Sequence, residues 1–341
     1  MFKKLNVTFV GNVGLKVHTG EIGGKYFLTP DFLQDIYNYT NGTFIECNTA
    51  YLSGHRETTE RHKHVLQVHG WLDKGRRTII MDENPDDDFV LNIPNHRNIS
   101  LNYVGAHMRK IDNVLVLAHF KGHPAGGFGG VLKQLSIGFA SRRGKTYIHT
   151  GGYTTDYKIM TQHIATQKDF TSAMADAASS IINYFKYTKH GQIVYINVLS
   201  NISKWCDCGG ARSPPPKIRD LGILASHDPV AIDRAAYDLI KSENNEGSKE
   251  LIGMSEGLLG TNTLTIAEEL GIGTQDYNLI DVDSKGVPIS KKNILLLILI
   301  PILLVVVIVG IIVGIVLFRK FKKNDSTSSS NSQSKVGIIN E

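Results

Sequence analysis

The chain alternates short β-branched runs with longer segments whose apolar residues have helical spacing. Val114–Ala118 is apolar throughout, as expected of a central strand that is covered on both faces. Alternating strands and helices predict an α/β fold with a mostly parallel or mixed sheet and helices on both faces. The expected strands are 13–17, 43–47, 78–81, 99–104, 114–118, 193–199, 221–225 and 277–282, and the expected helices are 30–38, 57–69, 131–137, 170–185, 229–241 and 264–270.

A continuous apolar stretch lies near the C-terminus. Ile294–Phe318 contains no charged or strongly polar side chain in 25 residues. As a helix it would extend ~37 Å at ~1.5 Å per residue, enough to cross a hydrocarbon core of ~30 Å. The sequence therefore predicts a single-pass membrane protein with the lipid bilayer as a partner. The predicted organisation is an α/β domain over 1–283, a stalk over 284–293, a transmembrane helix over 294–318 and a basic, Ser-rich, disordered tail over 319–341.

The distribution of Lys and Arg around this helix predicts its orientation. More of them follow the helix than precede it, so the positive-inside rule places the tail in the cytosol. The α/β domain would then lie outside the cell or in a lumen, at the plasma membrane or an endomembrane, and would need a signal peptide. Leu5–Val17 is too interrupted by Asn, Gly and Lys to be one. Two interpretations remain open: the sequence lacks its true N-terminus, or the protein is tail-anchored with its domain in the cytosol.

Charge and cysteine content narrow the classes of partner and scaffold. The whole formal net charge of +5 falls in residues 291–341, so residues 1–290 are neutral overall. A neutral domain has no electrostatic footprint for nucleic acid, and we expect no nucleic-acid partner. The chain has three cysteines, Cys47, Cys206 and Cys208. This small, odd number argues against a scaffold held together by disulfides. The oligomeric state is not indicated by the sequence.

The loop after Val114–Ala118 is the first candidate site. Ligands of open α/β sheets bind at the carboxyl ends of strands, and glycines there let the backbone approach a ligand closely. Amides at the start of the next helix would face an anion. The spacing fits neither a P-loop nor a dinucleotide fingerprint, and a tight turn with incidental histidines is the alternative interpretation. The candidate ligand-binding residues of this loop are Lys121, Gly127, Gly129, Gly130 and Lys133.

Cys206 and Cys208 form the second candidate site, after the expected strand 193–199. Two thiols two residues apart can hold one soft metal ion or support an iron–sulfur-type centre. Because two cysteines are not four, a complete site would borrow further ligands, and His119 and His123 are the candidates. A redox-active or strained disulfide and a pair of structural thiols remain as alternatives.

Other polar residues follow the remaining strands. Lys16 and His18 come after the first expected strand, and Asn48 and Arg56 lie in the loop after the second. Arg56 could bind a carboxylate or phosphate with two parallel hydrogen bonds. His227 follows the strand 221–225, just before an Asp-Pro helix start, and we expect it near the same site.

Five separated motifs occur in a fixed order: Val17-His-Thr-Gly-Glu21, Asn48-Thr-Ala-Tyr51 with Gly54 and Arg56, His119-Phe-Lys-Gly-His123 with Gly-Phe-Gly-Gly130, Cys206-Asp-Cys208, and Gly222-Ile-Leu-Ala-Ser-His-Asp-Pro-Val-Ala-Ile-Asp233. Together they resemble the family catalogued as domain of unknown function 362, over Val13 to Ile280. Members often carry ferredoxin-like iron–sulfur modules. The interval 146–169 contains no cysteine, so the ferredoxin segment of many relatives is expected to be missing here. Relatives also tend to begin with an extra strand and helix, which favours an incomplete N-terminus.

Three hypotheses of function follow. In the first, the domain binds a transition metal or an iron–sulfur-type centre together with a small anionic ligand at the strand ends, for redox or other small-molecule chemistry. In the second, it is a membrane-displayed ligand-binding module without catalysis. In the third, it is a structural spacer. The sequence does not decide whether the protein is an enzyme.

Overall fold

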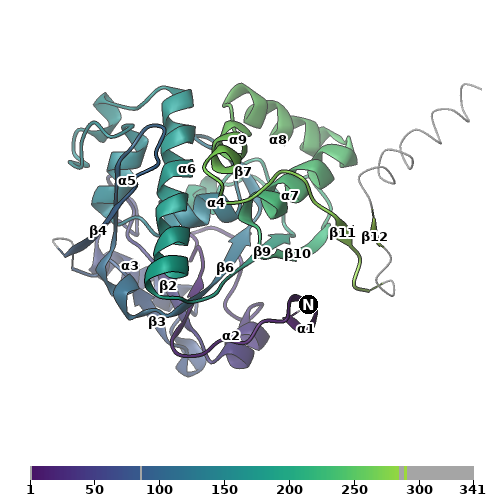
Figure 1. Ribbon diagram of the computed structural model, residues 1–341, viewed down its shortest axis with the longest axis horizontal. Helices are drawn as coiled ribbons and strands as arrows, with labels where there is room; N and C mark the ends of the chain where they lie inside the picture. Colours follow the sequence, from purple (N-terminus) through teal and green to yellow (C-terminus); the bar gives the residue numbers. More distant parts are fainter. Residues whose placement is uncertain (1, 85–86, 284–287, 290–341) are drawn as a thin grey trace, which may run out of the picture. The chain divides into compact units, whose positions relative to one another are not determined.

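The computed structural model describes residues 2–84, 87–283 and 288–289 (Figure 1). The helices are α1 (Phe2–Leu5), α2 (Gln34–Thr40), α3 (Thr59–Val68), α4 (Val131–Lys133), α5 (Arg142–His149), α6 (Gln167–Asn183), α7 (Pro229–Glu243), α8 (Glu246–Gly257) and α9 (Asn262–Glu269). The strands are β1 (Val13–Lys16), β2 (Thr43–Glu46), β3 (Thr78–Ile80), β4 (Asp88–Asn92), β5 (Leu101–Gly105), β6 (Asn113–His119), β7 (Lys121–His123), β8 (Gly127–Gly129), β9 (Ile193–Leu199), β10 (Gly222–Ser226), β11 (Leu279–Ile280) and β12 (Pro288–Ile289).

A six-stranded sheet with the order β10-β9-β6-β1-β2-β3 organises the chain up to Tyr277. Neighbouring strands are parallel except β10, which runs antiparallel to β9. Every residue of β6 is buried, as expected of a central strand. Among the described residues beyond Tyr277, which belong to a second unit, β11 pairs with β12.

Alternate side chains of β6 enter two hydrophobic cores, one on each face of the sheet. Val114 and Val116 belong to a cluster with residues of α4, α6 and α7, whereas Leu115 and Leu117 pack in a cluster with Leu66 of α3. Figure 1 shows α6 and α7 on one side of the strands and α2 on the other. The prediction of an α/β fold with a mixed sheet and helices on both faces is confirmed.

Several elements differ from the sequence-based expectation. The expected strand 99–104 is β5, which pairs antiparallel with β4 outside the main sheet. The expected helix 131–137 is a single α-helical turn, α4, continued by a π-helical turn at Gln134–Gly138. The glycine-rich loop is a hairpin of β7 and β8, in which Gly122 approaches the Lys204 carbonyl so closely that a Cβ would lie 2.1 Å from its oxygen.

The prediction of a single-pass membrane protein is contradicted. Within residues 2–84, 87–283 and 288–289, no helix is long and apolar enough to cross a bilayer. The longest α-helix among them, α6, has 17 residues and carries Lys168, Asp169 and Asp176, so it is both too short and too polar. The predicted stalk falls largely outside the described residues, and the predicted span 294–318 and the tail fall entirely outside them.

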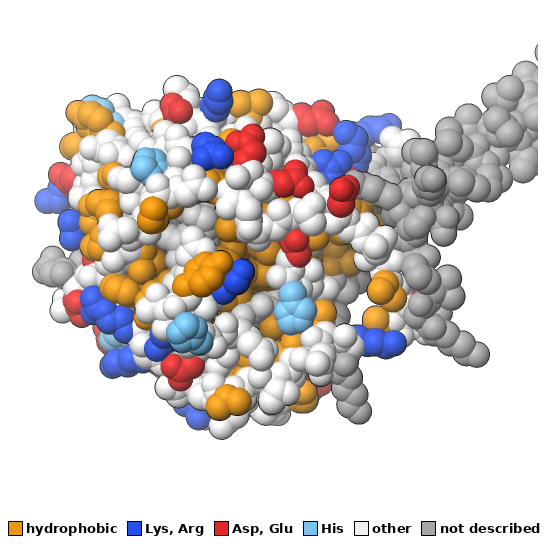
Figure 2. Space-filling model, in the orientation of Figure 1, with side chains coloured by type: hydrophobic (Ala, Val, Ile, Leu, Met, Phe, Trp, Pro, Cys, Tyr) orange, Lys and Arg blue, Asp and Glu red, His pale blue; other side chains and the backbone are white. Residues whose placement is uncertain are grey.

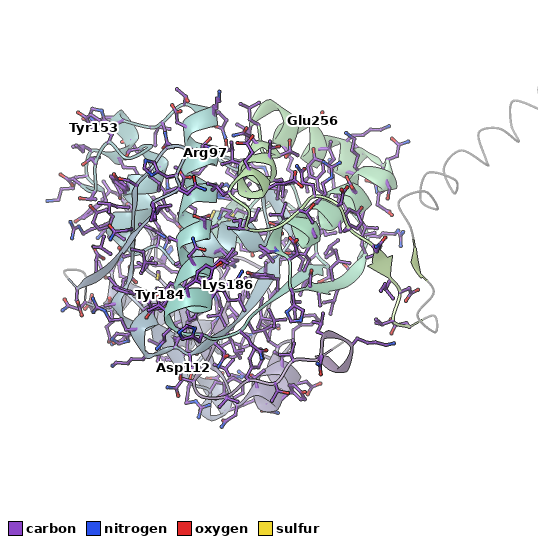
Figure 3. All side chains as sticks on the ribbon, viewed as in Figure 1. Arg97, Asp112, Tyr153, Tyr184, Lys186 and Glu256 are labelled. Carbon is purple, nitrogen blue, oxygen red and sulfur yellow. The ribbon has the colours of Figure 1, made fainter. Side chains whose placement is uncertain are left out.

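Two buried carboxylates join segments that are distant in the sequence. Asp233 of α7 accepts hydrogen bonds from the backbone N of Val131 (2.8 Å), the backbone N of Leu132 (2.9 Å) and the side-chain amide of Asn197 (2.8 Å). Asp176 of α6 accepts from three successive backbone amides, beginning at Arg97, which lies beside α6 in Figure 3. The first carboxylate fixes where α4 begins, and α4 lines the site described below.

Asp233→Ala should lower the free energy of unfolding by roughly 3 kcal/mol, because it leaves three buried donors without an acceptor. Urea unfolding followed by circular dichroism measures the change. Glu60→Ala, on the exposed first turn of α3, is the matched control and should change stability by less than ~0.5 kcal/mol. Equal stability of the two variants would contradict the role given to Asp233.

Candidate functional site

A cavity of about 220 Å³ opens where β1, β2 and β6 end. Parallel strands bring their carboxyl ends to one edge of the sheet, so residues that follow different strands meet there. The cavity is lined mainly by basic, histidine and small residues with a single acid, Glu46. Its lining residues are His18, Glu46, Thr49, Ala50, Tyr51, Arg56, His119, Lys121, His123, Pro124, Gly129, Gly130, Lys133, Gln134, Ile137, Gly138, Lys145, His149, Met160 and Cys208.

A network of buried charges forms the floor of the cavity. Glu46, at the end of β2, pairs with Lys16 Nζ at 3.2 Å and with Arg56 NH1 at 3.5 Å. It also accepts from the backbone N of Thr19 at 2.9 Å. Burial by itself would raise the pKa of Glu46, but the charges of Lys16, His18 and Arg56 outweigh burial and hold that pKa far below its usual range.

Arg56 is largely occupied by protein partners. Besides Glu46, its Nε lies 3.5 Å from Glu21 Oε2, and its NH2 lies 3.4 Å from the Tyr51 hydroxyl and 3.3 Å from His18 Nε2. The guanidinium is 1% exposed. Arg56 therefore contributes positive potential to the cavity and pairs with two carboxylates at 3.5 Å, while its buried Nε has no hydrogen-bond partner among the described residues.

A second buried carboxylate, Asp207, positions the turn that carries the cysteines. Asp207 lies 2.6 Å from Lys121 Nζ and 3.0 Å from His119 Nδ1. His119 Nε2 faces the Ser200 carbonyl at 2.8 Å, so both of its ring nitrogens already have partners. Burial would raise the pKa of Asp207, but His119 and Lys121 hold it well below its usual range. His119 thus orients the cysteine turn and stands outside the thiol cluster.

His123, Cys206 and Cys208 form a cluster that could hold a metal ion. One candidate ligand atom from each lies within 4.8 Å of the others. The cluster is buried, and Cys208 is its half-buried member on the cavity wall. The backbone amides of Ala125 and Gly126 donate to His123 Nδ1 at 3.2 and 3.0 Å, which leaves Nε2 for the sulfur atoms.

The two thiols differ in acidity. Burial would raise the pKa of Cys206, but the hydrogen bond from Cys208 and the charges of Lys133 and His123 lower it well below its usual range. The hydrogen bond to Cys206 and burial raise the pKa of Cys208. Burial and the nearby Lys133 lower the pKa of His123 to about 4. The pKa values of the two thiols are therefore shifted in opposite directions, and Cys206 is the more acidic of the pair.

Two lysines of the cavity have no carboxylate partner. No carboxylate of the described residues lies within 4 Å of the Nζ atom of Lys133 or Lys145. Lys145 Nζ donates to the Ala140 carbonyl at 2.6 Å. Lys133 Nζ makes no hydrogen bond with any of the described residues. These two residues add positive charge to the cavity without a carboxylate contact, although Lys133 acts through space on Cys206 and Lys145 on the buried carboxyl group of Asp82.

The expected anion site at the start of α4 is filled by the protein itself. The amides of Val131 and Leu132 donate to Asp233, so they are not free for a ligand. Gly130 is required there because a Cβ would lie 2.3 Å from Asp233 Oδ1. Gly129 lines the cavity, but Gly127, with a φ of +76°, packs against Ser255 and Gly260 instead.

The remaining candidate residues from the sequence differ in where they lie relative to the cavity. His227 follows β10, whose antiparallel direction places its end beside Tyr195 at the opposite edge of the sheet, where His227 Nε2 faces the Leu5 carbonyl at 2.9 Å. The expectation that His227 lies near the site is therefore wrong. Asn48 is buried below the cavity and bonds Thr59 and Asp82, whereas His18 lines the cavity itself and Lys16 supports its floor.

Sequence reasoning missed Lys145 and His149, which line the cavity from α5. No recognised motif marks this segment, and its short helix was not predicted. The burial of Gly144, Lys145 and Ile148 is apparent only in the structure. Across the face shown in Figure 2, acidic and basic side chains are interspersed, in keeping with the neutral charge balance of residues 1–290.

The family assignment rests on a match over residues 13–238 to the family described as Domain of unknown function (DUF362). The chain belongs to this family. The match gives no support for a lost ferredoxin segment or a membrane anchor. No curated protein matches the sequence.

Two solved structures resemble the fold weakly. The lactate racemase apoprotein from Thermoanaerobacterium thermosaccharolyticum is 11% identical, with a TM-score of 0.42 over 70% of this chain and 51% of that one. A protein from Thermotoga maritima is 11% identical, with a TM-score of 0.40 over 78% of this chain and 57% of that one. The chain thus spans little more than half the length of either structure.

Glu46→Gln should lower the unfolding free energy at neutral pH by roughly 3–5 kcal/mol, because Lys16 and Arg56 lose their shared counter-ion. The folded-state pKa of Glu46 lies below its unfolded value, so its contribution is present above about pH 5 and is lost as pH falls. The gap between wild type and variant should therefore narrow at about pH 3 in urea unfolding. The exposed change Glu60→Gln is the control, and a gap that is independent of pH would refute the assignment.

Proposed function

We propose that the domain binds one soft transition-metal ion through Cys206, Cys208 and His123, with a small organic anion beside it. The observation that carries the proposal is the juxtaposition of three soft donors with a cavity lined by two lysines that make no ion pair with a carboxylate of the described residues. Because Cys208 reaches the cavity wall, a ligand in the cavity would lie next to the metal.

The donor set fits such an ion. Two sulfurs and one imidazole nitrogen suit zinc, copper(I) or iron, and three protein ligands leave one position open, as in catalytic sites. Ligands about 2.3 Å from a tetrahedral metal are about 3.8 Å from each other. The cluster, with atoms within 4.8 Å, therefore needs only a small contraction. A cluster of several irons would call for more thiolates than these two cysteines supply.

The anion would bind beside Lys133 and Lys145, which no carboxylate of the described residues contacts within 4 Å. Arg56 and Lys121 add positive potential but keep their own partners, Glu46 and Asp207. A bound metal would supply Lewis-acid or electron-transfer chemistry. The protein's own part is to orient the anion, exclude bulk water from a cavity of about 220 Å³ and hold the thiolate charge.

A second candidate is a reactive thiolate that binds no metal. The hydrogen bonds from Ala125 and Gly126 leave His123 Nδ1 without a proton, so a neutral ring carries its proton on Nε2, toward Cys206. In that tautomer His123 donates to the thiolate. A metal at Nε2 would have to displace that proton, and the ring would stay neutral only if Nδ1 gave up its two amide hydrogen bonds and took a proton. Metal content decides between the two candidates.

The full chain, purified anaerobically with reductant, should contain about one equivalent of a transition metal by elemental analysis. Cys206→Ser/Cys208→Ser should contain none. Cys47→Ser is the matched control and should retain the metal, because Cys47 is fully buried with its thiol against the Phe139 carbonyl. A folded wild type without metal would overturn the metal proposal, and fast alkylation of Cys206 or Cys208 would then favour the thiolate.

Inorganic phosphate should bind the full chain measurably, and Lys133→Met should weaken that binding at least about tenfold because a charged donor is lost. Isothermal titration calorimetry measures both dissociation constants. Lys168→Met, on the exposed first turn of α6, should leave the affinity unchanged. The anion proposal fails if wild type and Lys133→Met bind phosphate equally.

A further inference from the structure

His149 is a cavity residue to which the proposed function gives no role. It is the last residue of α5 and lines the same cavity as His123, Lys133 and Lys145. Its ring packs against Phe170, with centroids 4.8 Å apart. This contact and the hydrogen bond described next leave the imidazole little freedom to turn.

The tautomer of His149 follows from its hydrogen bond. Its Nδ1 lies 2.7 Å from the Lys145 carbonyl, which can only accept, so Nδ1 carries the proton. In a neutral ring, Nε2 then holds a lone pair. Burial, with the charges of His123, Lys133 and Lys145, lowers the pKa of His149 to about 4, so the ring is neutral at physiological pH.

The Nε2 atom is an acceptor without a donor. No described residue donates a hydrogen bond to it. The atom is not fully buried, so a ligand can reach it. Lys133 and Lys145, which line the same cavity, can bind the anionic group of a ligand, whereas the lone pair of His149 Nε2 cannot. A ligand that satisfies both must present a hydrogen-bond donor next to its charge.

We propose that the anion of this cavity carries a hydroxyl close to its carboxylate or phosphate group, and that His149 Nε2 accepts the hydrogen bond from that hydroxyl. The inference rests on the proposed anion site and names its substrate class: small hydroxylated acids or hydroxylated phosphate esters. His149 is the specificity-determining residue, and the lysines supply the affinity that hydroxylated and unhydroxylated anions share.

Matched ligand pairs test this on the full chain by isothermal titration calorimetry. Malate is compared with succinate, in case the anionic group of the ligand is a carboxylate. Glycerol 3-phosphate is compared with propyl phosphate, in case that group is a phosphate. In at least one pair, wild type should bind the hydroxylated member roughly tenfold more tightly. In His149→Phe, which keeps an aromatic ring against Phe170, that ratio should fall to near one while the affinity for the unhydroxylated member is retained.

Two further variants separate a polar role from a packing role. His149→Gln has a side-chain oxygen that can accept a hydrogen bond, and it should recover part of the preference. His64→Phe, at an exposed position of α3, should keep the wild-type ratio. Unfolding curves for each variant identify any loss of binding that is due to misfolding.

The outcomes separate the inference from the function on which it rests. If wild type binds none of the four ligands and no inorganic phosphate, the anion site itself is wrong. If it binds both members of each pair equally, the anion site stands and the hydroxyl inference is overturned. A preference that persists in His149→Phe also overturns it, because another group, such as a bound metal, would then hold the hydroxyl.

Discussion

The buried carboxylate of Glu46 is the constraint around which this edge of the sheet is built. A buried charge is tolerated only when it is paired and hydrogen-bonded, so Lys16, Arg56 and the Thr19 amide must all reach one point. That requirement joins the end of β1 to the end of β2 and to the loop after it. Lys16 Nζ also donates to Gln134 at 3.0 Å, which extends the same constraint to the turn after α4. Charge pairing and hydrogen bonds therefore connect the segments that line the cavity.

The same pairing determines which residues remain available to a ligand. Glu46 occupies Arg56, Asp207 occupies Lys121 and His119, and Asp233 occupies the amides at the start of α4. Most of these groups looked like the natural anion binders of the sequence, yet each is paired within the protein, although Arg56 Nε itself makes no hydrogen bond among the described residues. The cavity groups that are left include Lys133 and Lys145, the Cys208 thiol and the unpartnered nitrogen of His149. Thr49 Oγ1 and Arg56 Nε also lack a hydrogen-bond partner among the described residues. A site is better identified by what stays unsatisfied after folding than by which polar residues follow the strands.

Sequence patterns predicted the parts of this fold that depend on periodicity. The apolar run of β6 indicated a central strand, and the cysteine pair and His123 were correctly placed at one edge. The periodicity of apolar residues does not show the direction of a strand. The antiparallel course of β10 could therefore not be predicted, and His227 was assigned to the edge of the sheet that holds the cavity. Likewise, no local pattern shows that a carboxylate more than a hundred positions away, Asp233, will take the amides of Val131 and Leu132. The membrane prediction rested on hydropathy alone, and the described helices do not support it.

The proposed metal and anion sites share one cation, which couples them. The charge of Lys133 lowers the pKa of Cys206. In the metal-free protein, the Cys206 sulfur would therefore partly offset the positive potential that Lys133 gives the cavity. A metal cation bound by the two sulfurs would neutralise the Cys206 thiolate, and Lys133 would then be free to attract an anion. The anion would in turn compensate the added positive charge of the metal. Each ligand would therefore increase the affinity for the other by the same factor, as linkage requires. The field of one lysine would thus make the cavity bind its anion tightly only when the metal is in place.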